Sequence, residues 1–253
     1  MKIRILPSSP DAGHLQQLIS FVVDGRLAID AGCIGFCGLP DAQARITTIV
    51  LTHSHLDHIC SLPIFAMNVL DSSGHGIVVW APPTVIDSLR QDIFNWRVWP
   101  DFTSLKIDGH PLVQLAPLEP RRPTELGGFS VTAIPVNHPV SNVAYLVEDD
   151  RSAVLFALDT GPTEEIWEVA RRTPRLTTVF VDAGFPDEMG TLAEASGHLT
   201  PSLVQTEVGR LPATVRKIAC HLKPAYHDRI VDQLGRLAIS NLSIGCPGHE
   251  YDG

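Results

Sequence analysis

The sequence predicts an α/β protein of the α+β type, in which two β-sheets pack face to face and helices cover their outer surfaces. Short apolar runs of strand length outnumber the helical patterns along the chain. The two kinds of segment follow one another in a mixed order, and the first half is rich in strand-like runs before its first helical pattern. A βαβ repeat would alternate regularly, so these observations favour a sandwich of two sheets.

The apolar runs and helical patterns define the expected elements in chain order. Strands are expected over Phe21–Val23, Leu27–Ile29, Thr48–Leu51, Ile77–Trp80, Phe129–Ile134, Ala144–Val147, Ala153–Leu158, Thr178–Val181, Ile218–Cys220 and Leu242–Ile244. Helices are expected over Leu62–Leu70, Thr84–Ile93, Thr163–Arg172, Pro201–Val208 and Asp228–Leu237. No low-complexity linker or solenoid repeat divides them, so we expect a single domain over residues 1–253.

Composition and charge exclude several classes of protein. The formal net charge is −9, which argues against a stable nucleic-acid partner or an anionic membrane surface. No apolar run reaches membrane-spanning length, and the apolar part of Met1–Leu6 is too short for a signal peptide, so we expect no membrane association and a cytoplasmic location. The number of cysteines, five, is odd, and no two of them have Cys-x-x-Cys spacing, so we do not expect a framework of disulfide bonds.

The most informative segment places three histidines and one carboxylate within six positions. His53, His55, Asp57 and His58 directly follow the apolar run 46–51, which is typical of a buried strand. On an extended segment, residues two apart point the same way, so His53 and His55 can bind one ion together. Asp57 and His58 can turn toward a second ion. Neutral imidazole and carboxylate are ligands that zinc and similar ions accept, so this segment predicts a metal site.

Three later residues are the candidates for the remaining ligands. His138 follows the apolar run Val131–Val136, Asp159 follows Val154–Leu158, and His221 follows Ile218–Cys220. Each alone is an ordinary polar residue at a strand end. In a sandwich, however, chemistry gathers where strand ends and loops converge, so the three are placed to complete the first cluster.

This pattern resembles that of the metallo-β-lactamase superfamily. The resemblance implies a four-layer αββα sandwich with two divalent metal ions and a metal-bridging hydroxide. One ion would be held by His53, His55 and His138. The other would be held by Asp57, His58 and His221. Asp159 would bridge the two ions, and Asp57 and Asp159 would take part in catalysis.

Two further aspects of the resemblance concern the reaction and the metal. The redox branch of the superfamily is expected to carry a carboxylate at position 54, so Ser54 indicates hydrolysis instead of electron transfer. Zn²⁺ is the expected cofactor, although imidazole and carboxylate also accept Mn²⁺ and Fe²⁺.

Further segments look like those of the class II cyclic-nucleotide phosphodiesterases, over roughly Asp24 to Pro224. The stretches that weigh most are Phe94-Asn95-Trp96 and Gly197-His198-Leu199-Thr200-Pro201. The chain departs from the eukaryotic members at Asp182-Ala183-Gly184, where Glu and Ser would be expected, and it is shorter than they are. The resemblance implies hydrolysis of 3′,5′-cyclic nucleotides to 5′-nucleotides, with a small phosphodiester as substrate.

Several residues outside the ligand set are candidates for the reaction. His198 is the candidate general acid for the leaving oxygen, and Thr200 is a candidate hydrogen-bond donor to a phosphoryl oxygen. Lys223 could contact a phosphate or lie at the surface. Trp96 and Trp99 could stack on a base, but their spacing equally suits a core or a homodimer contact. Asp30 suits either a turn or a partner that orients a ligand imidazole.

The sequence also allows other hydrolase functions and one non-catalytic function. The same metal set suits enzymes that act on RNA 3′ ends or other phosphodiesters, although the basic arm of transfer-RNA 3′ processing enzymes is not found here. Lactone and thioester hydrolases would not need His198 and the Thr-Pro that follows. A non-catalytic module that keeps zinc for stability is the alternative from another class.

Overall fold

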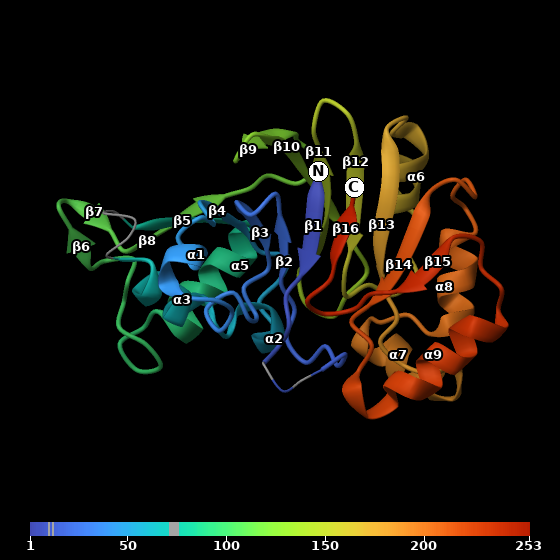
Figure 1. The fold of residues 1–253 in the computed structure, drawn as a ribbon. Coiled ribbons are helices and arrows are strands. Elements are labelled where there is room, and N and C mark those ends of the chain that lie inside the picture. Colours follow the sequence, from blue (N-terminus) through green and yellow to red (C-terminus); the bar gives the residue numbers. More distant parts are fainter. Residues whose placement is uncertain (10, 12, 71–75) are drawn as a thin grey trace.

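The computed structural model describes residues 1–9, 11, 13–70 and 76–253. Figure 1 shows two sheets side by side in the middle of the molecule, with one group of helices beyond the first sheet and another beyond the second. The two chain ends lie next to each other, because strand β1 (Lys2–Ile5) pairs antiparallel with β16 (Glu250–Asp252).

The first sheet has seven strands in the order β16-β1-β2-β3-β4-β5-β8. Its strands from β16 to β3 pair antiparallel, and those from β3 to β8 pair parallel. The bounds of the remaining strands are β2 Phe21–Val23, β3 Leu27–Ile29, β4 Thr48–Val50, β5 Ile77–Ala81 and β8 Val113–Pro117. A separate hairpin joins β6 (Lys106–Ile107) to β7 (His110–Pro111).

The second sheet has the order β15-β14-β13-β12-β11-β10-β9 and mirrors the first in its pairing. Strands β9 to β12 pair antiparallel, and β12 to β15 pair parallel. The bounds are β9 Thr124–Leu126, β10 Phe129–Pro135, β11 Val143–Glu148, β12 Ala153–Ala157, β13 Leu176–Asp182, β14 Arg216–Cys220 and β15 Leu242–Ile244. The carboxyl ends of its parallel strands therefore meet at one edge of the sheet.

The core between the two sheets is apolar and aromatic. Phe21 of the first sheet and Phe156 and Phe180 of the second are fully buried, with ring centroids 5.0 to 5.4 Å apart. In β1, Ile3 and Ile5 point into this core while Arg4 between them is exposed, as the alternation of a strand requires. This packing fixes the two sheets face to face.

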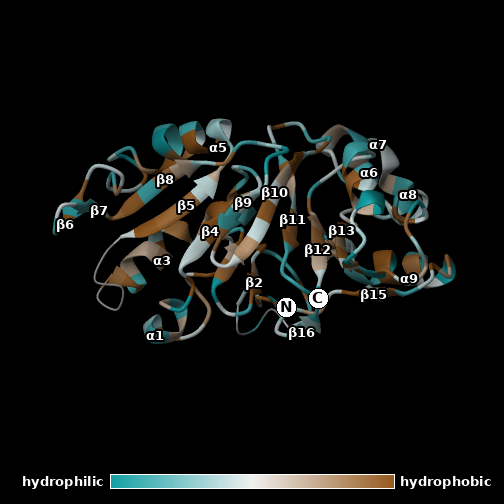
Figure 2. Cartoon of the chain, turned by 90° about the horizontal axis from the view of Figure 1, so that it is seen from above, coloured by the Kyte–Doolittle hydropathy of each residue, from teal (hydrophilic) through white to brown (hydrophobic). Residues whose placement is uncertain are grey.

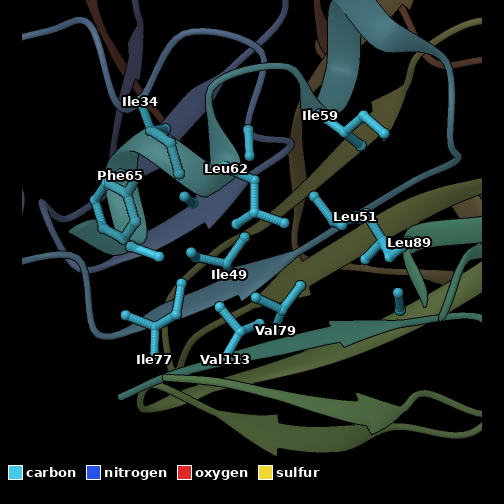
Figure 3. Close-up of a cluster of buried hydrophobic side chains, with 14 of the residues drawn as sticks. Ile34, Ile49, Leu51, Ile59, Leu62, Phe65, Ile77, Val79, Leu89 and Val113 are labelled. Carbon is cyan, nitrogen blue, oxygen red and sulfur yellow. The ribbon is translucent and has the colours of Figure 1, made fainter. Parts of the chain in front are cut away.

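Helices cover the outer face of each sheet and form the outer layers. Figure 3 shows Leu62 and Phe65 of helix α3 above Ile49, Val79 and neighbouring side chains of the first sheet. The helices of that side are α1 Pro40–Gln43, α2 Leu56–Ile59, α3 Leu62–Asn68 and α5 Pro83–Ser88, which continues as a π-helical turn over Leu89–Ile93. The other side has α6 Glu165–Arg172, α7 Gly190–Ser196, α8 Pro201–Val208 and α9 His227–Arg236, with 3₁₀ turns over Asp187–Met189 and Pro224–Tyr226.

The distribution of hydropathy fits these four layers. In Figure 2 the strands of both sheets are mainly hydrophobic, whereas hydrophilic residues gather on the outer helices and loops. No helix in the described ranges is long and apolar enough to span a membrane. The αββα sandwich predicted from the sequence is therefore confirmed.

All ten predicted strands are present, with ends shifted by at most a residue or two. The prediction missed β9 of the second sheet, both strands of the β6–β7 hairpin and three strands of the first sheet. These last three are β1, β8 and β16, which lie at or near the sheet's edges and alternate polar and apolar residues. The helix predicted over Thr84–Ile93 begins one residue earlier in the structure, at Pro83, and changes to π-helical geometry at Leu89. Cys33, Cys37, Cys60, Cys220 and Cys246 are all free thiols.

Candidate metal centre

The candidate ligands lie where strand ends of both sheets meet. The segment from His53 to His58 follows β4 of the first sheet. His138 lies between β10 and β11, Asp159 follows β12, and His221 follows β14. Because β12 and β14 are parallel members of one sheet, their carboxyl ends carry Asp159 and His221 to the same edge.

The His-rich segment is held by a loop of the first sheet. The short helix α2 begins at Leu56, directly after His55, and so presents Asp57 and His58 on its first turns. The backbone N–H of Ala31 donates to the His58 carbonyl at 2.7 Å. Gly32 passes so close to the motif that a Cβ atom there would lie 2.0 Å from the Asp57 carbonyl oxygen. A side chain at position 32 would therefore displace the motif.

One group of potential ligand atoms comes from His53, His55, His138 and Asp159, whose ligand atoms all lie within 4.8 Å of one another. Nε2 of His138 is 3.3 Å from Nδ1 of His55. Nε2 of His53 is 3.7 Å from Oδ2 of Asp159. Spacings of this order suit side chains that converge on a shared ion.

A second group comes from Asp57, His58, Asp159 and His221, again within 4.8 Å of one another. Nε2 of His58 is 3.3 Å from Oδ1 of Asp159, and Nε2 of His221 is 3.2 Å from Oδ2 of Asp57. Asp159 is the member common to both groups, as a bridging ligand must be.

Four buried atoms of this cluster have no hydrogen-bond partner among the described residues. They are Nε2 of His53, Nε2 of His58, Oδ1 of Asp159 and Nδ1 of His221. Nδ1 of His221 lies only 2.8 Å from Oδ1 of Asp159, yet the contact lacks the angles of a hydrogen bond. Buried polar atoms in proteins are normally paired. Unpaired imidazole nitrogens and a carboxylate oxygen that converge on one space are the donor set of a divalent metal, so these residues fit such ions.

Outer partners fix the orientation of two of these imidazoles. Oδ2 of Asp30 accepts a hydrogen bond from Nδ1 of His58 at 2.7 Å, which leaves Nε2 directed into the site. Nδ1 of His138 lies 3.1 Å from the carbonyl of Gly197 and can donate to it, which leaves its Nε2 toward His55. Metal-binding histidines are commonly held in this way. Asp30 fits both roles that the sequence allowed, because it has a left-handed turn conformation directly after β3 and also holds the His58 ring.

The imidazoles of the site fall into two groups, one with a lowered pKa and one with a raised pKa. Burial lowers the pKa of His53, His55 and His138, so these rings are neutral near pH 7, as metal ligands must be. Burial opposes the charged form of His58 too, but the carboxylates of Asp159 and Asp30 outweigh it and raise its pKa to about 10. Asp159 likewise outweighs burial and raises the pKa of His221.

The carboxylates show the reciprocal effect. Burial would raise the pKa of Asp159, but the positive charges of His221 and His58 hold it well below its usual value. In the metal-free protein these protons therefore supply the positive charge that neutralises the buried carboxylates. A bound cation would take over that role and displace the protons.

His198 forms a buried pair beside the cluster. Its Nδ1 lies 3.2 Å from Oδ2 of Asp182, the last residue of β13, and Asp182 also accepts a hydrogen bond from the Leu199 N–H at 2.8 Å. Oδ1 of Asp182 is 3.3 Å from Nδ1 of His221. The pair therefore touches the candidate ligand set, and Asp182 leaves Nε2 of His198 available for other chemistry.

Three residues of the site have left-handed backbone geometry without being glycine. They are Asp30, Asp159 and His221, with φ of 61°, 44° and 59°. Each directly follows a strand or lies within two residues of its end. Non-glycine residues rarely adopt this conformation, and such strain concentrates at functional sites.

Two of the residues predicted to contact the substrate, Lys223 and Thr200, lie in different surroundings. Nζ of Lys223 lies 3.0 Å from Nε2 of His221 and 3.7 Å from Oδ2 of Asp57, at the rim of the site. Thr200 occupies the N-cap position of α8 and is buried, and within the described residues its hydroxyl makes no capping bond there.

The aromatic segment divides into a packed part and an exposed part. Trp99 packs on Phe102 and against the outer core of the first sheet, whereas Trp96 is 63% exposed. Within the described residues, no hydrogen bond, ion pair or ring contact joins either tryptophan to the candidate ligands.

Sequence reasoning missed three residues that support the site. Asp182 is one of them. It could have been found from its position at the end of an apolar strand, because that strand runs parallel to those that precede Asp159 and His221. Asn142 donates from Nδ2 to the Asp159 carbonyl at 2.6 Å, and Oε1 of Gln16 accepts from the His221 N–H at 2.8 Å. Gln16 lies in an irregular loop far away in sequence, where no pattern marks it.

Comparison with known proteins agrees with this architecture. The family model described as the beta-lactamase superfamily domain matches residues 36–222. The chain belongs to the metallo-β-lactamase superfamily. This superfamily membership was predicted from the His53–His58 motif and is confirmed.

The similar sequences are named cyclic-nucleotide phosphodiesterases. A 3′,5′-cyclic-nucleotide phosphodiesterase of Candida albicans is 30% identical over 137 residues, 53% of this chain and 30% of that protein. A probable 3′,5′-cyclic-nucleotide phosphodiesterase of Yersinia pestis is 24% identical over 227 residues, 80% of this chain and 64% of that protein. The matches thus span less than two thirds of these two relatives.

Among solved structures, unliganded yeast PDE1 superposes with a TM-score of 0.80 at 18% identity, over 98% of each chain. The short form of human tRNase Z superposes with a TM-score of 0.68 at 16% identity, over 100% of this chain and 99% of that one. At these identities, the superpositions show that this metallo-β-lactamase superfamily member shares their fold.

Proposed function

We propose that this protein is a metal-dependent hydrolase that cleaves 3′,5′-cyclic nucleotides to 5′-nucleotides. The observation that carries the hydrolase assignment is the convergence of unpaired imidazole and carboxylate atoms at the meeting point of both sheets. The substrate class rests on the similarity to proteins named 3′,5′-cyclic-nucleotide phosphodiesterases. The proposal treats residues 1–253 as one catalytic unit.

We place two divalent ions, most suitably Zn²⁺, on the two groups of ligand atoms. His53, His55 and His138 would hold one ion, and Asp57, His58 and His221 the other. Asp159 would contact both. When bound, such ions lower the pKa of a coordinated water and neutralise charge on phosphoryl oxygens. Asp30 and the Gly197 carbonyl would keep the imidazoles in the tautomer that binds metal.

His198 is the proposed proton donor to the leaving oxygen. Hydrolysis of a 3′,5′-cyclic phosphate forms a bond from phosphorus to a water oxygen and breaks the bond from phosphorus to O3′. The departing O3′ needs a proton, and Nε2 of His198 can supply it while Asp182 holds Nδ1. The carboxylate of Asp182 also holds the His198 ring in the orientation that this transfer needs.

Lys223 is the proposed contact for the anionic phosphate. Its ammonium lies 3.7 Å from Oδ2 of Asp57 and 29% of the side chain is exposed, so it faces both the site and solvent. Trp96, being exposed, is available for stacking on a base, while Trp99 is packed in the outer core. We therefore assign the stacking role to Trp96 alone. Thr200 is a weaker candidate for a phosphate contact because its side chain is buried.

The test is hydrolysis of 3′,5′-cyclic AMP by the metal-reconstituted full chain, with 5′-AMP followed by chromatography. We expect 5′-AMP to form only when metal is present, and Asp159→Asn to remove both bound metal and turnover. The matched control is Asp149→Asn, an isosteric change far from the site, which should keep both. Cleavage of a nitrophenyl phosphodiester without 5′-AMP formation would retain the hydrolase and refute the substrate. Full turnover by Asp159→Asn would refute the site.

A further inference from the structure

A cavity lies on the outer face of the first sheet, apart from the candidate metal centre. It has a volume of about 680 Å³ and lies over strands β1 and β2, against the loop 34–38 and helix α1. Among the described residues that line it, none is a candidate metal ligand, and neither His198 nor Asp182 takes part. Its volume falls within the range of small-molecule sites, about 300 to 1,000 Å³.

The inner wall of this cavity is apolar. The side chains of Leu6 and Val22 come from the face of the first sheet that points away from the other sheet. Ile34, Phe36 and Ile46 complete the wall from the loop and the end of α1. Phe36 is 44% exposed, although it is a large hydrophobic side chain. An apolar body seated there would remove this surface from water, which is favourable.

The rim of the cavity carries two arginines without partners. In the described part of the chain, no acidic side chain lies within ion-pair distance of the Arg4 or Arg45 guanidinium, and neither guanidinium makes a hydrogen bond. The third cation at the rim, Lys2, is already engaged, since its Nζ lies 2.6 Å from Asp252 and 3.7 Å from Glu250. The cavity lining therefore carries three cations, Lys2, Arg4 and Arg45, against two carboxylates, and the two guanidiniums are the cations that form no ion pair among the described residues.

The carboxylates that also line the cavity are engaged within the protein. Glu250 pairs with Lys2, and Oδ1 of Asp24 accepts a hydrogen bond from the Lys2 backbone N–H at 2.6 Å. The whole chain has a net charge of −9, so two free guanidiniums beside an apolar wall stand out against an acidic protein. A guanidinium is a planar donor that matches carboxylate, sulfate and phosphate groups.

We propose that this cavity binds a small amphipathic anion, with an apolar body against Leu6, Val22 and Phe36 and an acidic headgroup at Arg4 and Arg45. The proposal goes beyond the hydrolase activity, because it concerns a different face of the protein and needs no metal. Charge complementarity selects an anion, and the concave apolar wall selects a ligand with a hydrocarbon or ring body.

The test is a calorimetric titration of the full chain with dodecanoate, kept below its micelle concentration. We expect saturable binding of one molecule per chain, weakened about tenfold or more by Arg4→Gln and by Arg45→Gln, since a hydrogen bond to a charged group typically contributes about that much. Both guanidiniums are exposed and unpaired, so these variants should fold normally. Arg236→Gln is the matched control, because its side chain is 79% exposed and lies on α9, outside the cavity. Dodecylammonium, with the same tail and the opposite charge, should not show saturable binding.

Cys37 locates the binding event within the molecule. Its half-buried thiol lines the cavity, so a ligand seated there would shield the thiol from alkylation. Dodecanoate should slow alkylation of Cys37 by N-ethylmaleimide and leave Cys246, outside the cavity lining, unchanged. The two sites can be distinguished by peptide mass analysis.

Several outcomes would overturn the proposal. Equal affinity of the double variant Arg4→Gln/Arg45→Gln, equal binding of dodecylammonium, or unprotected Cys37 would each do so. Sedimentation equilibrium tests the other occupant of such a face, a second copy of the chain. A dimer that dissociates when Phe36 is changed to Ser would make this face a subunit interface instead of a ligand site. None of these results depends on cyclic-nucleotide hydrolysis.

Discussion

The Asp30→Asn variant tests whether the outer partner of His58 governs metal binding. Asp30 is fully buried and makes four short contacts: Thr52 N at 2.8 Å, Thr52 Oγ1 at 3.0 and 2.8 Å, and His58 Nδ1 at 2.7 Å. Its φ of 61° is one that asparagine tolerates well, so the change adds no backbone strain. The variant therefore changes the chemistry of a single atom.

The expected loss follows from the hydrogen-bond directions. If the asparagine NH₂ group faces His58, two donors oppose each other, and the ring must move its proton to Nε2, the atom directed at the metal. If the amide is flipped, the buried N–H of Thr52 loses its acceptor instead. A hydrogen bond to a charged group is worth about 1.5 to 3 kcal/mol, which corresponds to roughly a 10- to 100-fold weaker metal affinity.

The assay is competition for Zn²⁺ with a chromophoric chelator, at a fixed pH near 7. Asp30→Asn should weaken the ion that His58 holds by that factor and affect the other ion less. Asp149→Asn, the same chemical change at a partly exposed site, should leave both affinities unchanged. Wild-type affinity for both ions in a folded Asp30→Asn variant would show that Asp30 does not act through His58.

Three other predictions address the leaving group, pH and the core. His198→Ala should keep both metals and lower turnover of cyclic nucleotides about 10²- to 10⁴-fold, but turnover of nitrophenyl esters much less, since nitrophenolate needs no proton; equal losses on both substrates would count against a general acid. In the metal-free protein the pKa of His58 is raised from 6.5 to about 10, so its protonated form stabilises the fold fully below pH 6.5 and loses this effect as pH rises toward 10. Because metal must displace that proton, chelator competition should show apparent metal affinity rising over the same window, and a pH-independent affinity would contradict it. Phe180→Ala should lower the free energy of unfolding in urea by about 3 to 5 kcal/mol, because the ring is fully buried between the sheets; Val98→Ala, at a 64% exposed position, should change it by less than about 0.5 kcal/mol.

The central strands could be predicted because burial makes their sequences uniformly apolar. Strand β12 is buried along its whole length and reads as Ala-Val-Leu-Phe-Ala. Strands β1 and β8 were not predicted, because only one face of each is buried and polar residues interrupt the apolar pattern. The strand β16, Glu-Tyr-Asp, has a single aromatic residue between two carboxylates, which is too short a pattern to predict a strand, and it is defined by its pairing with β1.

The candidate site could be predicted as far as strand ends mark it. His138, Asp159 and His221 each follow an apolar run, and the structure brings all three to the His-rich motif. Which residues orient them could not be read from the sequence, because those contacts join segments far apart along the chain. Gln16 reaches His221 across 205 positions, and Asp30 reaches His58 across 28.

The two kinds of cost at this site indicate what stabilises it. Three non-glycine residues have left-handed backbones, and four buried polar atoms have no hydrogen-bond partner in the described part of the chain. An unpaired buried polar atom costs about 1 to 3 kcal/mol. The ion pairs of Asp159 with His58 and His221 offset this cost only while those imidazoles are protonated. Both costs fall on the same residues, since Asp159 and His221 belong to both sets. A divalent ion that binds these atoms as ligands would pair them and so remove the cost of burying them unpaired. Metal loading should therefore stabilise the fold as well as prepare the site for hydrolysis.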